Sequence, residues 1–506
     1  MRFPLRLFAV SLLSILVLVS ALASPSLVAG QAPTSVPLGL QWMPPQRIPG
    51  YENDAMPPYL VADQNHNVYA FNSIWMGRSL VISYSQWNRI SGWSNPVDVV
   101  LSPWKQQARI MGAFLDDKGY VNLMFFGGDE LGAAIFFTRA PLIEAGNAQS
   151  WDKVALIGDS AITPATAALT GDGKGNLVVI YSGRFDRNGL YAIYSSDWGK
   201  NWTDPSTIYE VPDEVHWPAS VNLTTDERGI LHLVWTLVND SGNGDILYYS
   251  RLDAASHTWS NPYILAQRDP GDYETDWGSI VAYQGQLIVV YDDSAPATRW
   301  MRRSLDYGKT WSAPVRPFAY VGEYGFATYV IDSGGYLHMF LGNRSNDNPA
   351  THGMWHSVWL GDRWSDLEPV IVGPAVVDGP LSSRFDPSRP RAIMSNGNLI
   401  LLEWSTDPTA GRNGVWYTVT QLNTPEEAAM PLPTPEPIPT ATPRFAMVGA
   451  TQLQPTQSPL LAQFRNTPTN VEIPNPMKVL ASAFVTATAI CGMAVVIVRR
   501  RLFSKH

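Results

Sequence analysis

The chain has 506 residues, a formal net charge of −9 and a single cysteine, Cys491. This length exceeds what one compact hydrophobic core normally supports, and no basic run or arm favours nucleic acid as a partner. One cysteine cannot form an internal disulfide or a thiolate site for zinc or an iron–sulfur cluster. No phosphate-binding or dinucleotide-binding loop stands out either, and we expect no metal ion and no cofactor.

Residues 1–31 have the pattern of a secretory signal peptide. Arg2 and Arg6 form a positive start, an apolar run follows at 7–22, and Ala21 and Ala23 form a small-x-small cleavage site. An uncleaved anchor helix is the alternative. The pattern predicts that the rest of the chain is exported.

The C-terminal part of the chain predicts a membrane tether. Residues 479–498 are 20 residues without a charge, which is long enough to cross a bilayer as a helix. Arg499, Arg500 and Arg501 follow at once, so the positive-inside rule places the basic tail, 499–506, in the cytoplasm. We assign the transmembrane helix to 477–498, with a buried core helix as the alternative. The preceding residues, 424–476, are rich in proline and threonine and predict an extended linker.

An internal repeat runs through residues 32–423. A Trp followed by a small or polar step and Pro recurs at Trp93, Trp202, Trp259 and Trp311, and with two looser copies the spacing is 51 to 58 residues. Two apolar strands joined by a turn with Asp, Asn or Gly precede each copy. This repeat length is typical of a propeller blade. The sequence therefore predicts an all-β propeller of seven four-stranded blades, with six as the alternative.

The ends of the repeat region predict how the ring closes. The seventh unit lacks its last strand, and Trp42 stands 51 residues before Trp93, in the position of such a strand. Pairing the two chain ends would remove a free sheet edge, which is the main hazard of all-β architecture. We expect the strand near Trp42 to complete the last blade beside the strand around Val415.

Two hairpins carry the same eight-residue motif, Ser-x-Asp-x-Gly-x-(Asn/Thr)-Trp. The motif residues are Ser195, Asp197, Gly199 and Trp202 in one copy, and Ser304, Asp306, Gly308 and Trp311 in the other. Its chemistry suits a tight hairpin, because the carboxylate accepts backbone N–H bonds and glycine adopts positive φ. The motif resembles the Asp box, or BNR repeat, of the sialidase-like propeller superfamily. That resemblance covers about residues 38–422 and implies a structural role for both hairpins, on outer turns away from any catalytic centre.

The same resemblance suggests candidate catalytic residues. Sialidases bind a sugar carboxylate with three arginines and use a Tyr–Glu nucleophile and an Asp acid/base. Arg184 and Asp186 match the Gly-Arg strand end and the following Asp, which implies a substrate-binding arginine and a proton donor. Glu323 and Tyr324 are the candidate base and nucleophile. The arginine expected to open the strand before Arg184 is missing, since residues 162–165 read Ile-Thr-Pro-Ala.

Three connections between repeats are rich in ionisable and aromatic groups. They lie at 213–217, 268–277 and 384–391, and Trp217, Trp277 and Arg389 are the candidate substrate-binding residues in them. Carboxylates beside tryptophan suit sugar hydroxyls and ring faces. Solvated turns are the alternative.

Two functions fit these observations. One is a membrane-anchored cell-surface propeller that binds glycans or proteins at the mouth of its channel without catalysis. The other is an exo-glycosidase of the sialidase type, with Asp186 as acid/base. A scaffold for an exported assembly is a third possibility, and the sequence leaves open whether the chain is an enzyme.

Overall fold

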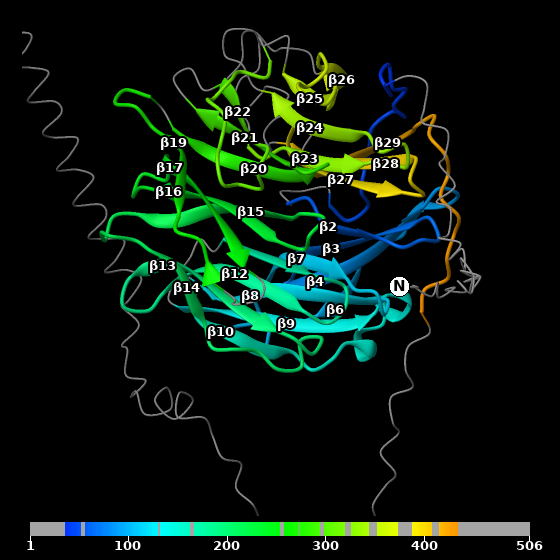
Figure 1. Cartoon of the computed structure of the whole chain (residues 1–506). Helices are drawn as coiled ribbons and strands as arrows, with labels where there is room; N and C mark the ends of the chain where they lie inside the picture. The colour runs from blue at the N-terminus through cyan, green and yellow to red at the C-terminus, as the bar shows by residue number, and fades with distance from the viewer. Residues whose placement is uncertain are drawn as a thin grey trace, which may run out of the picture. The chain divides into compact units, whose positions relative to one another are not determined.

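The computed structural model describes residues 36–51, 56–129, 132–161, 166–253, 258–272, 274–293, 298–318, 325–343, 352–372, 387–406 and 414–433. Within these residues the chain forms a seven-bladed β-propeller, as the sequence predicts (Figure 1). The predicted signal peptide, the linker beyond residue 433, the transmembrane segment and the basic tail lie outside them.

The first three blades follow one another along the chain. Blade 1 contains β2 (Tyr59–Ala62), β3 (Asn67–Met76), β4 (Ser79–Asn88), β5 (Gly92–Trp93) and β6 (Val97–Val100). Blade 2 contains β7 (Ala108–Leu115), β8 (Tyr120–Asp129), β9 (Gly132–Pro141) and β10 (Ala155–Ala161), with short 3₁₀ helices at Leu142–Glu144 and Ala148–Ser150. Blade 3 contains β11 (Ala167–Gly171), β12 (Leu177–Arg184), β13 (Asn188–Ser195) and β14 (Ser206–Glu210).

The remaining four blades complete the ring. Blade 4 contains β15 (Trp217–Thr225), β16 (Leu231–Val238), β17 (Gly244–Asp253), β18 (Thr258–Trp259) and β19 (Tyr263–Gln267). Blade 5 contains β20 (Asp276–Tyr283), β21 (Gln286–Asp293) and β22 (Thr298–Ser304), with a single outer bridge from Met301 to Val315. Blade 6 contains β23 (Thr328–Ile331), β24 (Leu337–Asn343), β25 (Gly353–Val358) and β26 (Glu368–Val372). Blade 7 contains β27 (Pro387–Ser395), β28 (Leu399–Thr406), β29 (Gly414–Gln421) and β1 (Gln46–Arg47).

Burial follows the strand order within a blade. The second strands β16 and β24 are buried at every position, because neighbouring blades cover both of their faces. The first strands of neighbouring blades contact one another and surround the channel. Their edges are capped by side chains, since Asn222 Oδ1 accepts a hydrogen bond from Ile280 N (3.0 Å) and Ser279 Oγ accepts one from Ala327 N (2.9 Å). This leaves fewer unpaired backbone groups on the inner strands.

The ring closes as predicted, by pairing the two chain ends. β1 pairs antiparallel with β29. Met43 N donates to Val419 O (2.9 Å) and Ile48 N donates to Val415 O (3.0 Å), so the hydrogen bonds continue on both sides of the short strand.

The antiparallel strands give the propeller two different faces. The turns between first and second strands, and those between third and fourth strands, lie on one face, which we call the turn face. The connections between second and third strands, and those between blades, lie on the opposite face, which we call the mouth face. The Asp boxes belong to the turn face, whereas Trp217, Trp277 and Arg389, which lie at or near the starts of inner strands, belong to the mouth face.

The residues after β29 lie on the turn face. Residues 424–433, here called the C-terminal strap, are drawn in orange at the right of Figure 1. Asn398 Nδ2 donates to Thr424 O (3.2 Å), and Met430 N donates to Gln64 O (2.9 Å). Leu432 then packs against the core between blades 1 and 2. The first ten residues of the predicted linker are therefore docked on the propeller.

Candidate functional site

Both Asp boxes form tight hairpins on the turn face. In the first, Asp197 Oδ1 accepts from Asn201 N (2.9 Å) and Ser195 Oγ accepts from Gly199 N (2.9 Å). Gly199 has a φ of 78°, which glycine adopts without strain. Trp202 packs edge-on against a phenylalanine of the preceding blade, with ring centroids 5.1 Å apart. The motif's polar groups are therefore used within the hairpin.

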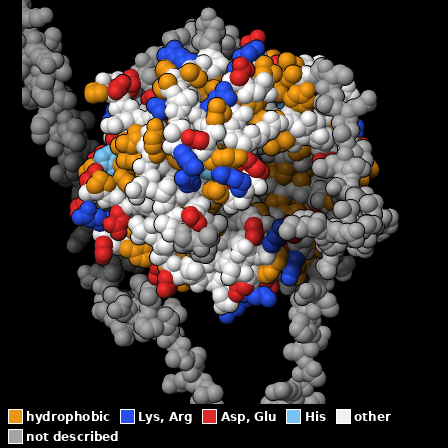
Figure 2. Space-filling view, in the orientation of Figure 1, with side chains coloured by type: hydrophobic (Ala, Val, Ile, Leu, Met, Phe, Trp, Pro, Cys, Tyr) orange, Lys and Arg blue, Asp and Glu red, His pale blue; other side chains and the backbone are white. Residues whose placement is uncertain are grey.

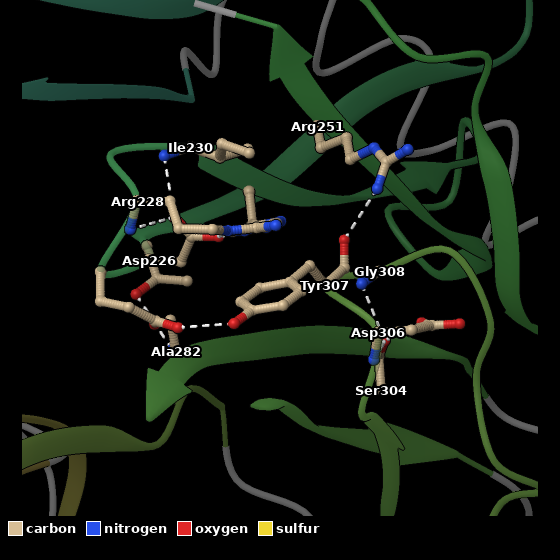
Figure 3. Close-up of polar contacts among 12 residues, drawn as sticks. Asp226, Arg228, Ile230, Arg251, Ala282, Ser304, Asp306, Tyr307 and Gly308 are labelled. Atoms are coloured by element: carbon tan, nitrogen blue, oxygen red, sulfur yellow. Dashed lines mark hydrogen bonds and ion pairs between the residues drawn. The ribbon is translucent and has the colours of Figure 1, made fainter. Parts of the chain in front are cut away.

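The second Asp box also joins two blades (Figure 3). The Tyr307 ring lies under the Arg228 guanidinium, 3.1 Å from its carbon, and the Tyr307 hydroxyl donates to Glu227 Oε1 (2.9 Å). Arg251 Nη1 donates to the Tyr307 carbonyl (3.0 Å). Hydrogen bonds to Thr310 lower the pKa of Asp306 to about 2, so this carboxylate stays charged at neutral pH. Blade 5 is thereby fastened to the first turn of blade 4.

The same joint connects blades 2 and 3. Lys118 Nζ lies 4.5 Å from the Trp198 ring centroid, and Arg139 Nη1 donates to the Trp198 carbonyl (2.8 Å). Trp198 and Tyr307 occupy the same variable position of the motif. The sequence analysis did not predict this joint. The signals for it are the aromatic residue after the Asp of each motif and the basic residues Lys118 and Arg228, each of which precedes a turn glycine.

The candidate residues Arg184 and Asp186 lie on the mouth face. Arg184 ends β12, and both side chains are exposed. Asn188 Nδ2, two residues after Asp186, donates to His216 O (3.0 Å). The turn that carries Asp186 therefore lies beside the connection that leads to Trp217, which is half-buried at the start of β15.

A network of charged side chains lies next to this turn. His216 Nδ1 is 2.8 Å from Asp213 Oδ2, and His216 Nε2 is 3.0 Å from Asp245 Oδ2. Arg268 Nε donates to the other oxygen of Asp245 (2.6 Å). Burial alone would lower the pKa of His216, but its bonds to Asp245 and Asp213 outweigh burial and raise it. Asp245 belongs to none of the three polar connections predicted from the sequence.

Trp277 and Asp276 open the innermost strand of blade 5. The Trp277 ring meets Phe326 edge-on at 5.2 Å and is half-buried. Asp276 is 3% exposed, and its Oδ1 accepts from Trp277 N (2.6 Å). Burial raises the pKa of Asp276, so a proton is held more tightly here than on an ordinary aspartate.

Arg389 lies across the ring, in blade 7. It is exposed, and its Nη1 is 3.0 Å from the sulfur of Met56. Arg391, two residues on, stacks on the Tyr59 ring at 3.5 Å. Beneath them Glu403 is fully buried, and burial raises its pKa well above the usual range, against the charge of Arg391. Arg184 belongs to blade 3 and Arg389 to blade 7, and no contact between them is found among the described residues.

Other sequence candidates are placed as follows. Glu323 and Tyr324 lie outside the described residues. Within the described ranges, no group of three or more His, Cys, Asp or Glu side chains could hold a metal ion. No helix in the part of the chain that the structure describes is long and apolar enough to cross a membrane. On the face seen in Figure 2, acidic and basic side chains are interspersed with apolar ones.

A cavity of about 420 Å³ lies elsewhere, on the turn face between blades 3 and 4. Asp172 and Trp202 are among the residues that line it. Its carboxylates are already used, since Asp172 Oδ2 accepts from Asn176 Nδ2 (2.6 Å) and Asp197 Oδ2 accepts from Asn201 Nδ2 (2.6 Å). These two carboxylates therefore hold the turns that carry them.

No protein-family model and no curated protein matches the sequence. Similar solved structures include a lectin from Burkholderia pseudomallei, at 11% identity over 75% of this chain and 99% of the lectin, with a TM-score of 0.52. An ulvan lyase is 12% identical over 76% of this chain and 96% of its own (TM-score 0.48), and a sialidase from Streptococcus pneumoniae is 11% identical over 76% and 71% (TM-score 0.40). At these identities the likeness shows the fold alone. The likeness to the lectin agrees with the seven-bladed propeller that the strand order shows.

Proposed function

We propose that this chain is a membrane-anchored, extracytoplasmic propeller that binds glycans at its mouth face without catalysis. The observation that carries the proposal is the pair Trp217 and Trp277, half-buried at the starts of two adjacent inner strands. Carboxylates and a histidine lie beside them. Aromatic faces with nearby hydrogen-bonding groups suit sugar rings and their hydroxyls. A lectin shares the fold, which agrees with this use of it.

Binding is tested with the full chain in detergent micelles on an array of immobilised glycans. We expect saturable binding to at least one glycan class, weakened by Trp217→Ala. Tyr263→Ala is the matched control, because Tyr263 is 41% exposed at the start of the outer strand β19, on the turn face. Absence of binding to every glycan on the array would contradict the proposal.

The anchor is supported by the sequence, through the uncharged stretch at 479–498 and the arginines that follow it. Protease added to intact cells should remove the propeller and spare a tag at the C-terminus. Protection of the propeller from protease would contradict an extracytoplasmic location.

An exo-glycosidase with Asp186 as acid/base is the second candidate. The exposed Arg184 and Asp186 on the mouth face favour it, because both are open to a substrate. The assay is hydrolysis of aryl glycosides, sialosides included, by the full chain. Turnover that is lost in Asp186→Asn would replace binding by catalysis as the function.

A further inference from the structure

The turn between the first and second strands carries the same aspartate in five blades. These residues are Asp63, Asp116, Asp172, Asp226 and Asp332. In each of them Oδ1 accepts a hydrogen bond from the backbone N–H four positions on. In four of them Oδ2 also bonds a side chain six positions on, at 2.8 to 3.3 Å. The partners are Tyr69, Asn122, His232 and His338.

Blade 3 lacks this side chain from the second strand. The residue six positions after Asp172 is Val178, which has no polar group. Asp172 Oδ2 accepts only from Asn176 Nδ2 (2.6 Å), whereas the same oxygen in blade 1 accepts both from an asparagine and from the Tyr69 hydroxyl. Asp172 is exposed, and the other four aspartates are 4% to 6% exposed. Asp172 Oδ2 therefore has a lone pair left for one more donor.

Blade 3 also lacks an arginine on its third strand. At the same position in blades 2, 4 and 5, an arginine donates to a carbonyl in the next blade, at 2.8 to 3.0 Å. These residues are Arg139, Arg251 and Arg303, and Figure 3 shows the contact of Arg251. Arg139 Nη2 also lies 3.3 Å from Asp116 Oδ2. In blade 3 the position belongs to Tyr194, which pairs with Val178 as Arg139 pairs with Asn122.

The cavity of about 420 Å³ lies where these two groups are missing. Val178 and Tyr194 line it together with Asp172, and Leu231 of blade 4 adds an apolar wall. In blade 4 the residues between the third and fourth strands, 254–257, read Ala-Ala-Ser-His without an Asp box, and they lie outside the described residues. The cavity is large enough for a ligand.

The cavity carries negative charge. Burial alone would raise the pKa of Asp172, but hydrogen bonds from Asn176 and Lys174 outweigh burial and lower it. Asp197 lines the same cavity, and hydrogen bonds from Asn201 lower its pKa as well. In the part of the chain that the structure describes, no cationic side chain pairs with either carboxylate. A ligand with a cationic group and an apolar stem fits this lining.

We infer that the cavity between blades 3 and 4 is a docking site for an arginine side chain of a partner protein. The guanidinium pairs with Asp172 Oδ2, as Arg139 pairs with Asp116, and the aliphatic stem lies against Val178 and Leu231. The ring already places an arginine at this position in three blades, so the partner supplies the one that blade 3 lacks. The site lies on the turn face and does not depend on glycan binding at the mouth.

The test uses the full chain in detergent micelles and saturation-transfer NMR of two soluble peptides. One is acetyl-Gly-Ser-Arg-Ser-Gly-amide, and the other has citrulline in place of arginine, which keeps the shape and removes the charge. We expect saturable binding of the arginine peptide and about tenfold weaker binding of the citrulline peptide, the size of one lost charged hydrogen bond. Both probes meet the unaltered chain, so this comparison does not depend on how a variant folds.

Two variants locate the site. Asp172→Asn should weaken binding of the arginine peptide about tenfold. Tyr194→Arg places an arginine of the chain itself at the cavity and should abolish peptide binding. Asp240→Asn is the matched control, because it removes the same charge from an exposed loop on the mouth face, and it should keep wild-type binding.

Three results would overturn the inference. They are equal binding of the two peptides or of neither, unchanged binding by both cavity variants, and an equal loss in Asp240→Asn, which would mean that the peptide follows net charge. Glycan binding by Asp172→Asn should equal that of wild type, so failure of this inference leaves the proposed function standing.

Discussion

The two faces of the propeller use the same residue types in opposite ways. On the turn face, carboxylates are consumed by their own hairpins, as in Asp197 with Asn201 and Asp306 with Thr310. On the mouth face, Arg184 and Asp186 stand exposed and Asp276 is buried with a raised pKa, whereas non-glycine residues with positive φ occur on both faces, as at Trp277 and Tyr307. The turn face is built to hold the ring together. The mouth face exposes charged side chains and buries the Asp276 carboxyl, which points to function there.

The largest effect should come from breaking the buried ion pair near the mouth end of blade 5. Arg299 and Asp292 are 2.8 Å apart with no exposed side-chain surface. Asp292→Ala should lower the free energy of unfolding by about 3–5 kcal/mol, because it leaves the arginine buried and unpaired. Denaturant titration measures this, and Asp240→Ala, at an exposed loop, is the control. Adding Arg299→Met should recover part of the loss; equal losses in the single and double variants would contradict this account.

The joint between blades 2 and 3 should rank next. Arg139 is 7% exposed and bonds both the Trp198 carbonyl and Asp116. Arg139→Met keeps most of the packing and removes these bonds, so we expect a loss of about 2 kcal/mol in unfolding free energy. Arg109→Met, exposed on β7, should be neutral. If both variants unfold alike, the joint does not stabilise the turn face.

Glu403 gives a pH test of the mouth side. Its folded pKa is raised, so between the ordinary value, about 4.3, and that raised value the folded chain binds a proton that the unfolded chain releases. Stability from this group is therefore complete at low pH and falls as pH rises, by at most about 1.4 kcal/mol per pH unit. Glu403→Gln should remove this slope. The unfolding free energy of the variant should therefore rise relative to that of wild type as pH goes from 5 to 8. Parallel stability curves would show that Glu403 is not buried as a neutral acid.

A smaller effect is expected in the C-terminal strap. Leu432 is only partly buried against the core of blades 1 and 2. Leu432→Ala should cost about 1 kcal/mol of unfolding free energy, less than a fully buried leucine. Leu305→Ala, 70% exposed on the turn face, is the control. No difference between the two variants would mean that the strap is not part of the folded propeller.

The smallest expected effect is a shift in the pKa of His216, which can be measured on the wild-type chain. Two carboxylates flank His216, and its pKa is raised. An NMR titration of its ring should give a midpoint above the ordinary value of about 6.5. Because the folded pKa is raised, stability from His216 is present at low pH and fades as pH rises through that midpoint. A midpoint at or below 6.5 would mean that the network is not formed.

The sequence predicted the fold well because propeller blades repeat. Trp42 and its 51-residue spacing from Trp93 were enough to predict that β1 would close the ring. The Asp-box motif predicted the hairpins, because its hydrogen bonds connect residues four positions apart or fewer. Local spacing carries such information directly.

The site could be predicted only in part. Asp245 contacts a histidine 29 residues away, and no local pattern marks that contact. Ser220 occupies a left-handed bulge without the glycine that normally signals one. Glu403 stands within the apolar strand β28 and is fully buried there, which the sequence of that strand does not predict for a carboxylate.

Hydrogen exchange of the full chain, with and without the glycan that binds most tightly on the array, tests the division between the two faces most directly. Bound glycan should slow exchange in peptides covering 185–188, 213–222, 276–279 and 389–391, and leave 195–203 and 304–311 unchanged. Slowed exchange at 172–176 and 195–203, which include residues lining the cavity on the turn face, with no change at the mouth, would contradict the account.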